Sequence, residues 1–383
     1  MNEQIEYINN ENLFKYKNIE IKCPNDLIKV DSNNYKIFLF KNNHLQNSQS
    51  NIWAIKLDKI RCTCGFLLPI TRLDDSEETL SEENTPVTTV QARNKYKYAC
   101  YELLLKFYNF NNNKNNDMIS LISELYPDVY VLILCNKFIG EFNIYNYLPY
   151  LYKLGFLYIN NINISPQISD FHKKNRVLIE EYEGKQAIKL EKTFSDISKY
   201  EYIKNLFIKD LISVDNNLAR FMMLYQIVEI YIENRLEHET QFLLNSYKQK
   251  LCNFNDFKEN INKIQKERHR VDTLLKIKTT NNNFETEYKK LNLLSDSHDT
   301  TIGNQLYNIR NKLVHSFHLI ENRSVLNNLI TEIELVLIDL LLQKPINLQE
   351  CIREKAYFIS LENPTNSETY NWLLAEQTCK ELK

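Results

Sequence analysis

The chain has 383 residues, which suits two or three domains, and its 43% hydrophobic and 25% charged residues are ordinary for globular proteins. The formal net charge of −2 provides no overall attraction to nucleic acid or to anionic membranes, so such a site must be a local patch. Only five glycines are present, whereas average proteins have about 7% glycine. Because these five build no G-x-G-x-x-G, P-loop or G-x-S-x-G motif, the sequence argues against dinucleotide-binding, P-loop and nucleophile-elbow enzymes.

Cysteine content and hydropathy predict a cytoplasmic protein. Eight cysteines in a chain of this length are far fewer than a disulfide-stabilised scaffold contains. The first 30 residues are polar and acidic, unlike a secretory signal. No apolar run approaches the roughly 18 residues of a transmembrane helix. We therefore expect reduced thiols and no membrane partner.

The first 195 residues predict an α+β domain whose role the sequence does not reveal. Short runs of β-branched and aromatic residues predict strands at residues 35–40, 52–57, 62–70 and 129–134. A helix is expected at residues 92–108, and a β-hairpin at residues 176–194 with its turn at Glu183-Gly184. The acidic stretch at residues 74–84 predicts an exposed loop.

The second half of the chain has the pattern of an all-α domain. No proline interrupts residues 167–344, and Gly303 is the only glycine after Gly184. We expect a helical bundle over residues 200–345 and a helical extension over residues 346–383. Helices are predicted at residues 200–212, 216–244, 256–278, 302–317 and 322–342.

The segment with the clearest chemistry is residues 308–318, NIRNKLVHSFH. If it is helical, one apolar stripe faces the core, formed by Ile302, Leu306, Ile309, Leu313 and Phe317. Asn311 and His315 are i,i+4 neighbours on the opposite face, and Arg310 lies at the margin of the stripe. The pattern therefore predicts an amide and an imidazole on one surface outside the core.

The run from Arg310 to His315, RNKLVH, resembles the R-N-x-x-x-H signature of the HEPN superfamily. The run RFMMLYQIVEIYIE at residues 220–233 also resembles the first bundle helix of the Apea-like HEPN branch, in which an acidic residue follows an aromatic-Gln pair. The resemblance covers about residues 200–345. It implies a helical bundle that acts as a homodimeric, metal-independent ribonuclease of a toxin, antiphage or RNA-processing system.

The resemblance implies Arg310, Asn311 and His315 as catalytic residues, with RNA as the partner and no cofactor or metal. RNA supplies its own nucleophile, the 2′-hydroxyl, so the enzyme needs an acid or base that titrates near neutral pH, which imidazole provides. It also needs a permanent cation for the charge of the transition state, which arginine provides as a two-pronged donor. We expect residues 1–195 to sense a phage-derived trigger, to select substrates or to inhibit the bundle.

Glu229 is the fourth candidate catalytic residue. It falls near the middle of the apolar arc of the predicted helix at 216–244, where an unpaired carboxylate is costly. It either has a role in the site, where it holds Arg310 or lines the catalytic groove, or lies exposed at the rim of the bundle.

Residues 248–290 carry more basic than acidic side chains. They form either a track for the RNA backbone or a solvated helix surface. The candidate RNA-binding residues are Lys263, Lys266, Arg268, Arg270, Lys276 and Lys278.

Three other interpretations remain open from the sequence. The bundle can be a non-catalytic HEPN interaction or dimerisation module. A zinc site is disfavoured by its C-x-C spacing, although four candidate ligands occur in the first domain, at Cys23, His44, Cys62 and Cys64. A metal-dependent DNA nuclease in the first domain is weakly suggested by Tyr126-Pro127-Asp128 before a strand, but Glu141 lacks the lysine of an E-x-K motif.

Overall fold

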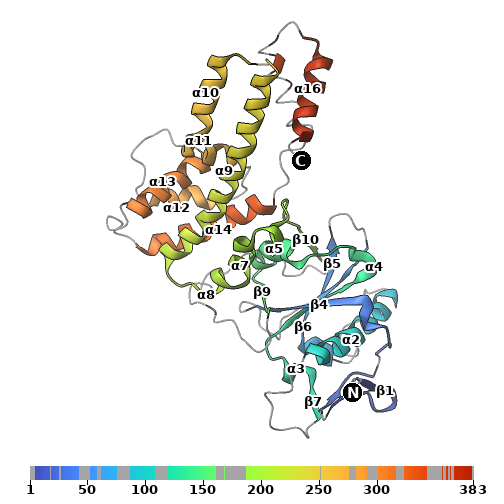
Figure 1. The fold of residues 1–383 in the computed structure, drawn as a ribbon. Coiled ribbons are helices and arrows are strands. Elements are labelled where there is room, and N and C mark those ends of the chain that lie inside the picture. The colour runs from blue at the N-terminus through green and yellow to red at the C-terminus, as the bar shows by residue number, and fades with distance from the viewer. Residues whose placement is uncertain are drawn as a thin grey trace. The chain divides into compact units, whose positions relative to one another are not determined.

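The computed structural model describes two compact units, Met1–Asp215 and Asn216–Lys383, shown in Figure 1. Its described residues are 5–17, 19–25, 27–42, 52–57, 62–75, 87–107, 119–160, 168, 187–250, 252–275, 282–290, 301–315, 323–342, 356, 359–360, 363 and 366–381. The first unit contains strands and helices and the second is helical, which confirms the expected fold class at this level. The division follows Asp215, so the predicted helix at 200–212 belongs to the first unit.

The first unit contains a six-stranded mixed sheet. In spatial order its described strands are β10 (Ala187–Leu190), β5 (Trp53–Leu57), β6 (Gly65–Pro69), β8 (Tyr130–Cys135), β4 (Tyr35–Lys41) and β9 (Leu157–Tyr158). All neighbours are antiparallel except β10 and β5. The four strands predicted from aromatic and β-branched runs are confirmed as β4, β5, β6 and β8. Of the predicted hairpin, residues 176–186 lie outside the described residues.

A second, four-stranded sheet lies on the other side of the long helix α2 (Val87–Phe107). Its order is β1 (Glu6–Ile8), β2 (Leu13–Tyr16), β3 (Ile19–Lys22) and β7 (Ile119–Leu121). Phe14 of β2 stacks on Tyr101 of α2, with ring centroids 5.4 Å apart. Residues of β6 and β8 pack against the same core cluster as this helix, so α2 is the middle layer between two sheets.

Side-chain alternation along β8 explains why the six-stranded sheet is covered on both faces. Val131 and Ile133 belong to the core cluster with α2, whereas the Tyr130 ring on the opposite face contacts Phe156 at 5.4 Å. Short helical segments complete this unit: α1 (Thr71–Asp74), α3 (Ile122–Leu125), α4 (Asn136–Ile139), α5 (Leu148–Lys153), α7 (Glu201–Asn205), a π-helical segment (Leu206–Asp210) and α8 (Leu211–Ser213).

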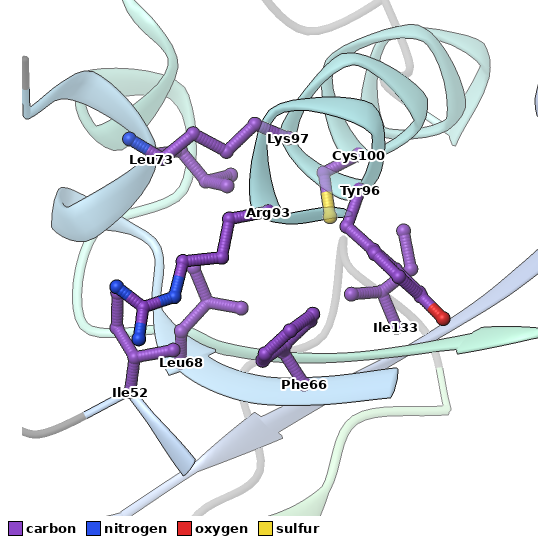
Figure 2. Close-up of a pocket in the computed structure, with 9 residues that line it drawn as sticks. All are labelled: Ile52, Phe66, Leu68, Leu73, Arg93, Tyr96, Lys97, Cys100 and Ile133. Atoms are coloured by element: carbon purple, nitrogen blue, oxygen red, sulfur yellow. The ribbon is translucent and has the colours of Figure 1, made fainter. Parts of the chain in front are cut away.

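A small pocket lies where α2 meets the six-stranded sheet (Figure 2). Phe66 and Leu68 line it from the sheet, and Arg93 and Lys97 extend over its edge from α2. The Lys97 ammonium donates a hydrogen bond to the Asp75 carbonyl at 2.8 Å. The two long side chains therefore cover the edge of the core with their aliphatic stems.

The second unit is built around the long helix α9 (Asn217–Lys248). The other helices that the structure describes in this unit are α10 (Phe254–Ile264), α11 (Glu267–Leu274), α12 (Asn282–Lys290), α13 (Ile302–His315), α14 (Arg323–Leu342) and α16 (Glu368–Glu381). The N-terminus of α9 is capped by Asn216, whose side chain accepts a hydrogen bond from the Ala219 amide at 3.0 Å. The predicted long helices at 216–244, 302–317 and 322–342 correspond to α9, α13 and α14.

The prediction of one helix over 256–278 is wrong, because the chain turns at Gln265 and Lys266 and forms two helices, α10 and α11. The backbone of Lys266 is extended there. This turn allows α11 to pack against both α9 and α13, whereas α10 packs alongside α9. The helix α12 was not among the predicted helices.

A buried ion pair joins α9 to α14. The Arg220 side chain is completely buried, and Glu334 is 4% exposed. The Nε and Nη2 atoms of Arg220 donate to the two Glu334 carboxylate oxygens at 2.9 and 3.0 Å. This two-pronged geometry fixes the register of the two helices, because either charge without the other would be buried and uncompensated.

We expect the Arg220→Met substitution to lower the free energy of unfolding by about 3–5 kcal/mol, because it leaves the Glu334 carboxylate buried without its cation. Urea denaturation of the second unit measures this change. The double substitution Arg220→Met with Glu334→Leu should recover much of the loss, since no charge remains buried. A double variant as unstable as the single one would contradict this account of the pair.

Candidate active site on helix α13

The predicted motif lies in the C-terminal half of α13. Leu306, Ile309 and Leu313 are buried, as the expected core stripe requires, whereas Ile302 at the start of the helix is half-buried and Phe317 lies outside the described residues. Asn311 is half-buried, and His315, the last residue of the helix, is exposed. The helix therefore presents its amide and imidazole away from the core, as its periodicity predicts.

Close packing against α11 positions the N-terminal end of α13. A Cβ atom at Gly303 would lie 2.4 Å from the Asp272 Cα, so only glycine allows this approach of the two helices. Asn304 accepts a hydrogen bond from the Arg268 Nε at 2.7 Å, and its own amide donates to Asp272 at 3.3 Å. These contacts hold the motif helix in one position relative to α11.

Arg310 is positioned by an aromatic ring of α9. Its guanidinium carbon lies 5.9 Å from the centroid of the Tyr225 ring, which is fully buried. Its Nη1 donates a hydrogen bond to the side-chain oxygen of Asn311 at 3.1 Å. The motif arginine therefore lies against a tyrosine ring and is bonded to the motif asparagine.

The Tyr225 hydroxyl is in turn anchored by α11, donating a hydrogen bond to Glu267 at 3.2 Å. Burial is the main reason why the pKa of Tyr225 is raised, and the nearby Glu267 carboxylate, which accepts the bond, raises it further. The Arg310 cation opposes this shift, and Glu229 adds a small contribution in the same direction as burial. Tyr225 therefore stays a neutral hydrogen-bond donor at physiological pH.

Glu229 is half-buried on α9, and its carboxylate accepts a hydrogen bond from Gln226. No ion pair joins it to Arg310, although the structure describes both residues. Glu267, which sequence reasoning did not select, is the carboxylate bonded to the tyrosine under Arg310. The sequence contained no local signal for it, because residues 256–278 read as one uninterrupted helix.

The candidate RNA-binding residues are spread over two helices and the turn between them. Lys263 lies on α10 and Lys266 at the turn, and both are exposed. Arg268 and Arg270 lie on α11 beside the motif helix; Arg268 is exposed, and the buried Nε of Arg270 has no hydrogen-bond partner in the described part of the chain. Lys276 and Lys278 lie outside the described residues.

The structure describes three of the four candidate zinc ligands. Cys23 and Cys64 are buried and Cys62 is exposed, whereas His44 lies outside the described residues. Burial raises the pKa of the Cys23 thiol to about 12, which favours the protonated thiol. In the described ranges, no group of three or more His, Cys, Asp and Glu side chains is arranged to hold a metal ion.

Among the residues of the DNA-nuclease interpretation, Tyr126 has a structural role in the core. The Tyr126 hydroxyl is buried and donates to the Leu104 carbonyl at 2.7 Å. Asp128 has a φ of 58° in the turn before β8, and Glu141 is exposed.

Comparisons of the chain with protein-family models, curated proteins and solved structures found no match. Within the part of the chain that the structure describes, no helix has the length and apolar character needed to cross a membrane.

We expect Gly303→Ala to lower the free energy of unfolding by about 1–3 kcal/mol, because the new Cβ forces α11 and α13 apart. At an unconstrained helical position the same substitution should instead stabilise the protein by roughly 0.5–1 kcal/mol. Denaturant titration determines the sign of the change. A variant that is more stable than the wild type would show that the two helices are not in close contact.

Proposed function

We propose that the protein is a metal-independent endoribonuclease and that Arg310, Asn311 and His315 form its active site. The observation that supports this most directly is the geometry of α13, in which Arg310 is bonded to Asn311 and the exposed His315 lies one turn from Asn311. A cation, an amide and an imidazole therefore lie in the C-terminal half of one helix. The resemblance of RNKLVH to the HEPN signature supports the same assignment.

In this reaction the 2′-hydroxyl oxygen of a ribose attacks the adjacent phosphorus atom, and the bond from phosphorus to the 5′-oxygen of the next nucleotide breaks. A base removes the 2′-hydroxyl proton, and an acid protonates the departing 5′-oxygen, so no proton is gained or lost overall. His315 performs one of these transfers. Arg310 stabilises the extra negative charge on the phosphorane-like transition state, and Asn311 holds the arginine and the phosphate.

The second proton transfer needs a second imidazole, and a two-fold dimer of the helical unit would supply it. His315 is exposed, so the same helix of another copy has access to it. Arg268 and Arg270, on the helix beside α13, and Lys263 and Lys266 nearby would bind the RNA backbone. In this proposal the first unit senses a phage-derived trigger, selects RNA or inhibits the helical unit.

The alternative is a HEPN-like interaction module without catalysis. The contacts of Arg310 with Asn311 and with the Tyr225 ring are compatible with this alternative, because they would also stabilise a helix that has only a structural role. Cleavage of RNA in the presence of EDTA distinguishes the two functions, since the interaction module predicts no cleavage by any variant.

We expect the purified protein to cleave RNA in EDTA and His315→Ala to lose roughly 10²–10⁴-fold in rate, because the substitution removes an acid or base. Arg310→Lys should also be impaired, since lysine keeps the charge but lacks the planar fork. Val314→Ala is the matched control, because Val314 is the exposed neighbour of His315 on the same helix. His315→Ala should change stability by no more than about 0.5 kcal/mol. Cleavage that requires Mg²⁺, or that survives His315→Ala, would contradict the proposed mechanism.

We also expect a homodimer in solution. Light scattering at micromolar concentration should give about twice the chain mass of 45.8 kDa, because a single copy has one motif imidazole for two proton transfers. A monomer with full ribonuclease activity would show that the second acid or base comes from the same chain.

A further inference from the structure

We infer that Tyr225 and Glu267 are positioning residues for Arg310. The face of the tyrosine ring holds the guanidinium group, and the guanidinium N–H groups that point away from the ring remain available to bind a phosphate. The inference rests on the proposed ribonuclease function and extends it to two residues outside the RNKLVH motif. In this inference, residues of α9 and α11 orient the motif arginine of α13.

The first support is the connection of three helices at this point. Arg310 of α13 lies over the Tyr225 ring of α9, at 5.9 Å from its centroid, and the Tyr225 hydroxyl is bonded to Glu267 at the start of α11. The ring is fully buried, so it has little freedom to rotate away. A guanidinium on this surface is therefore held by the packing of the bundle.

The second support is the way in which Arg310 is held. Glu229 and Glu267 both lie close enough to influence Tyr225 electrostatically, yet neither forms an ion pair with Arg310. An ion pair with either carboxylate would occupy the donor fork that a phosphate needs. The ring attracts the cation through its face and uses none of the guanidinium N–H groups. The only hydrogen bond from Arg310 among the described contacts is the one to Asn311.

The third support is the arrangement of the two carboxylates. Glu267 accepts the tyrosine hydroxyl, and Glu229 accepts the Gln226 amide. A phenol that donates to a carboxylate has a more electron-rich ring, which strengthens its attraction to a cation. Glu267 therefore acts on Arg310 through the ring.

The experiment compares three variants of the full-length protein. Tyr225→Phe keeps the ring and loses the bond to Glu267; Tyr225→Leu and Tyr225→Met fill similar space without a ring. Tyr247→Leu is the control, because Tyr247 is an exposed tyrosine about six turns further along the same helix, where its ring contacts Phe254 and Phe257 instead of Arg310. Thermal melting first identifies which variants remain folded.

The first readout is the NMR signal of the Arg310 Nε–Hε group, assigned by its absence in Arg310→Ala. The ring current of Tyr225 should shift this signal upfield in the wild type and in Tyr225→Phe. In the leucine and methionine variants it should move to the position typical of exposed arginines. This readout does not depend on catalysis, so it tests the positioning even if the protein proves to have no ribonuclease activity.

The second readout is cleavage of RNA. Tyr225→Leu and Tyr225→Met should lower kcat by roughly tenfold to a hundredfold with little change in KM, because the misplaced cation is needed in the transition state. Tyr225→Phe and Glu267→Gln should lower kcat by less than the leucine and methionine variants do, because they keep the ring but lose the bond to the Glu267 carboxylate that makes the ring more electron-rich. An unshifted Arg310 signal in the wild type would overturn the inference, as would full kcat in a folded Tyr225→Leu or Tyr225→Met variant.

Discussion

The second unit depends on one buried electrostatic constraint, the ion pair between Arg220 of α9 and Glu334 of α14. Two charges with almost no solvent contact are tolerated only when they meet with good geometry, and the two-pronged bond achieves this. The pair thereby fixes the axial register of α9 relative to α14. Tyr225 follows Arg220 by little more than one turn of the same helix, so the ring on which Arg310 lies is held by this constraint as well.

The close contact between α11 and α13 fixes the position of the motif helix relative to α11. Gly303 brings the two helices together at one end of the motif helix, and the Tyr225–Glu267 bond ties α11 to α9. Arg310 lies against a ring instead of a carboxylate, and no ion pair with another described residue occupies its guanidinium group. An oriented cation bonded to Asn311, with the exposed His315 imidazole one turn further along the same helix from that asparagine, would suit a site for a phosphodiester, and this is the physical basis of the proposed ribonuclease.

The sequence predicted the elements that are governed by local periodicity. The apolar stripe of α13 and the exposed position of His315 follow from a 3.6-residue repeat, and β8 follows from a run of buried β-formers. The turn between α10 and α11 was missed because Gln265 and Lys266 are ordinary helix residues, and tertiary packing decides the break. The role of Glu267 depends on that turn, so it was missed too.

The buried pair was missed for a different reason. Arg220 and Glu334 are 114 positions apart, and single-sequence patterns carry no information on which distant charges meet. Each nevertheless has an apolar residue on both sides in the sequence, and opposite charges in two such helices are a usable signal. The four-stranded sheet has the same difficulty, because β3 and β7 pair in parallel across a long stretch of sequence.

The most direct test of the central claim changes the substrate instead of the protein. After the cleavage site in a synthetic RNA has been mapped, a single 2′-O-methyl group is placed on the ribose whose hydroxyl would attack. The account predicts that cleavage at that position stops, that the RNA is still bound, and that the unmodified products carry 2′,3′-cyclic phosphate and 5′-hydroxyl ends. Continued cleavage at the methylated position, or products with 5′-phosphate ends, would contradict it.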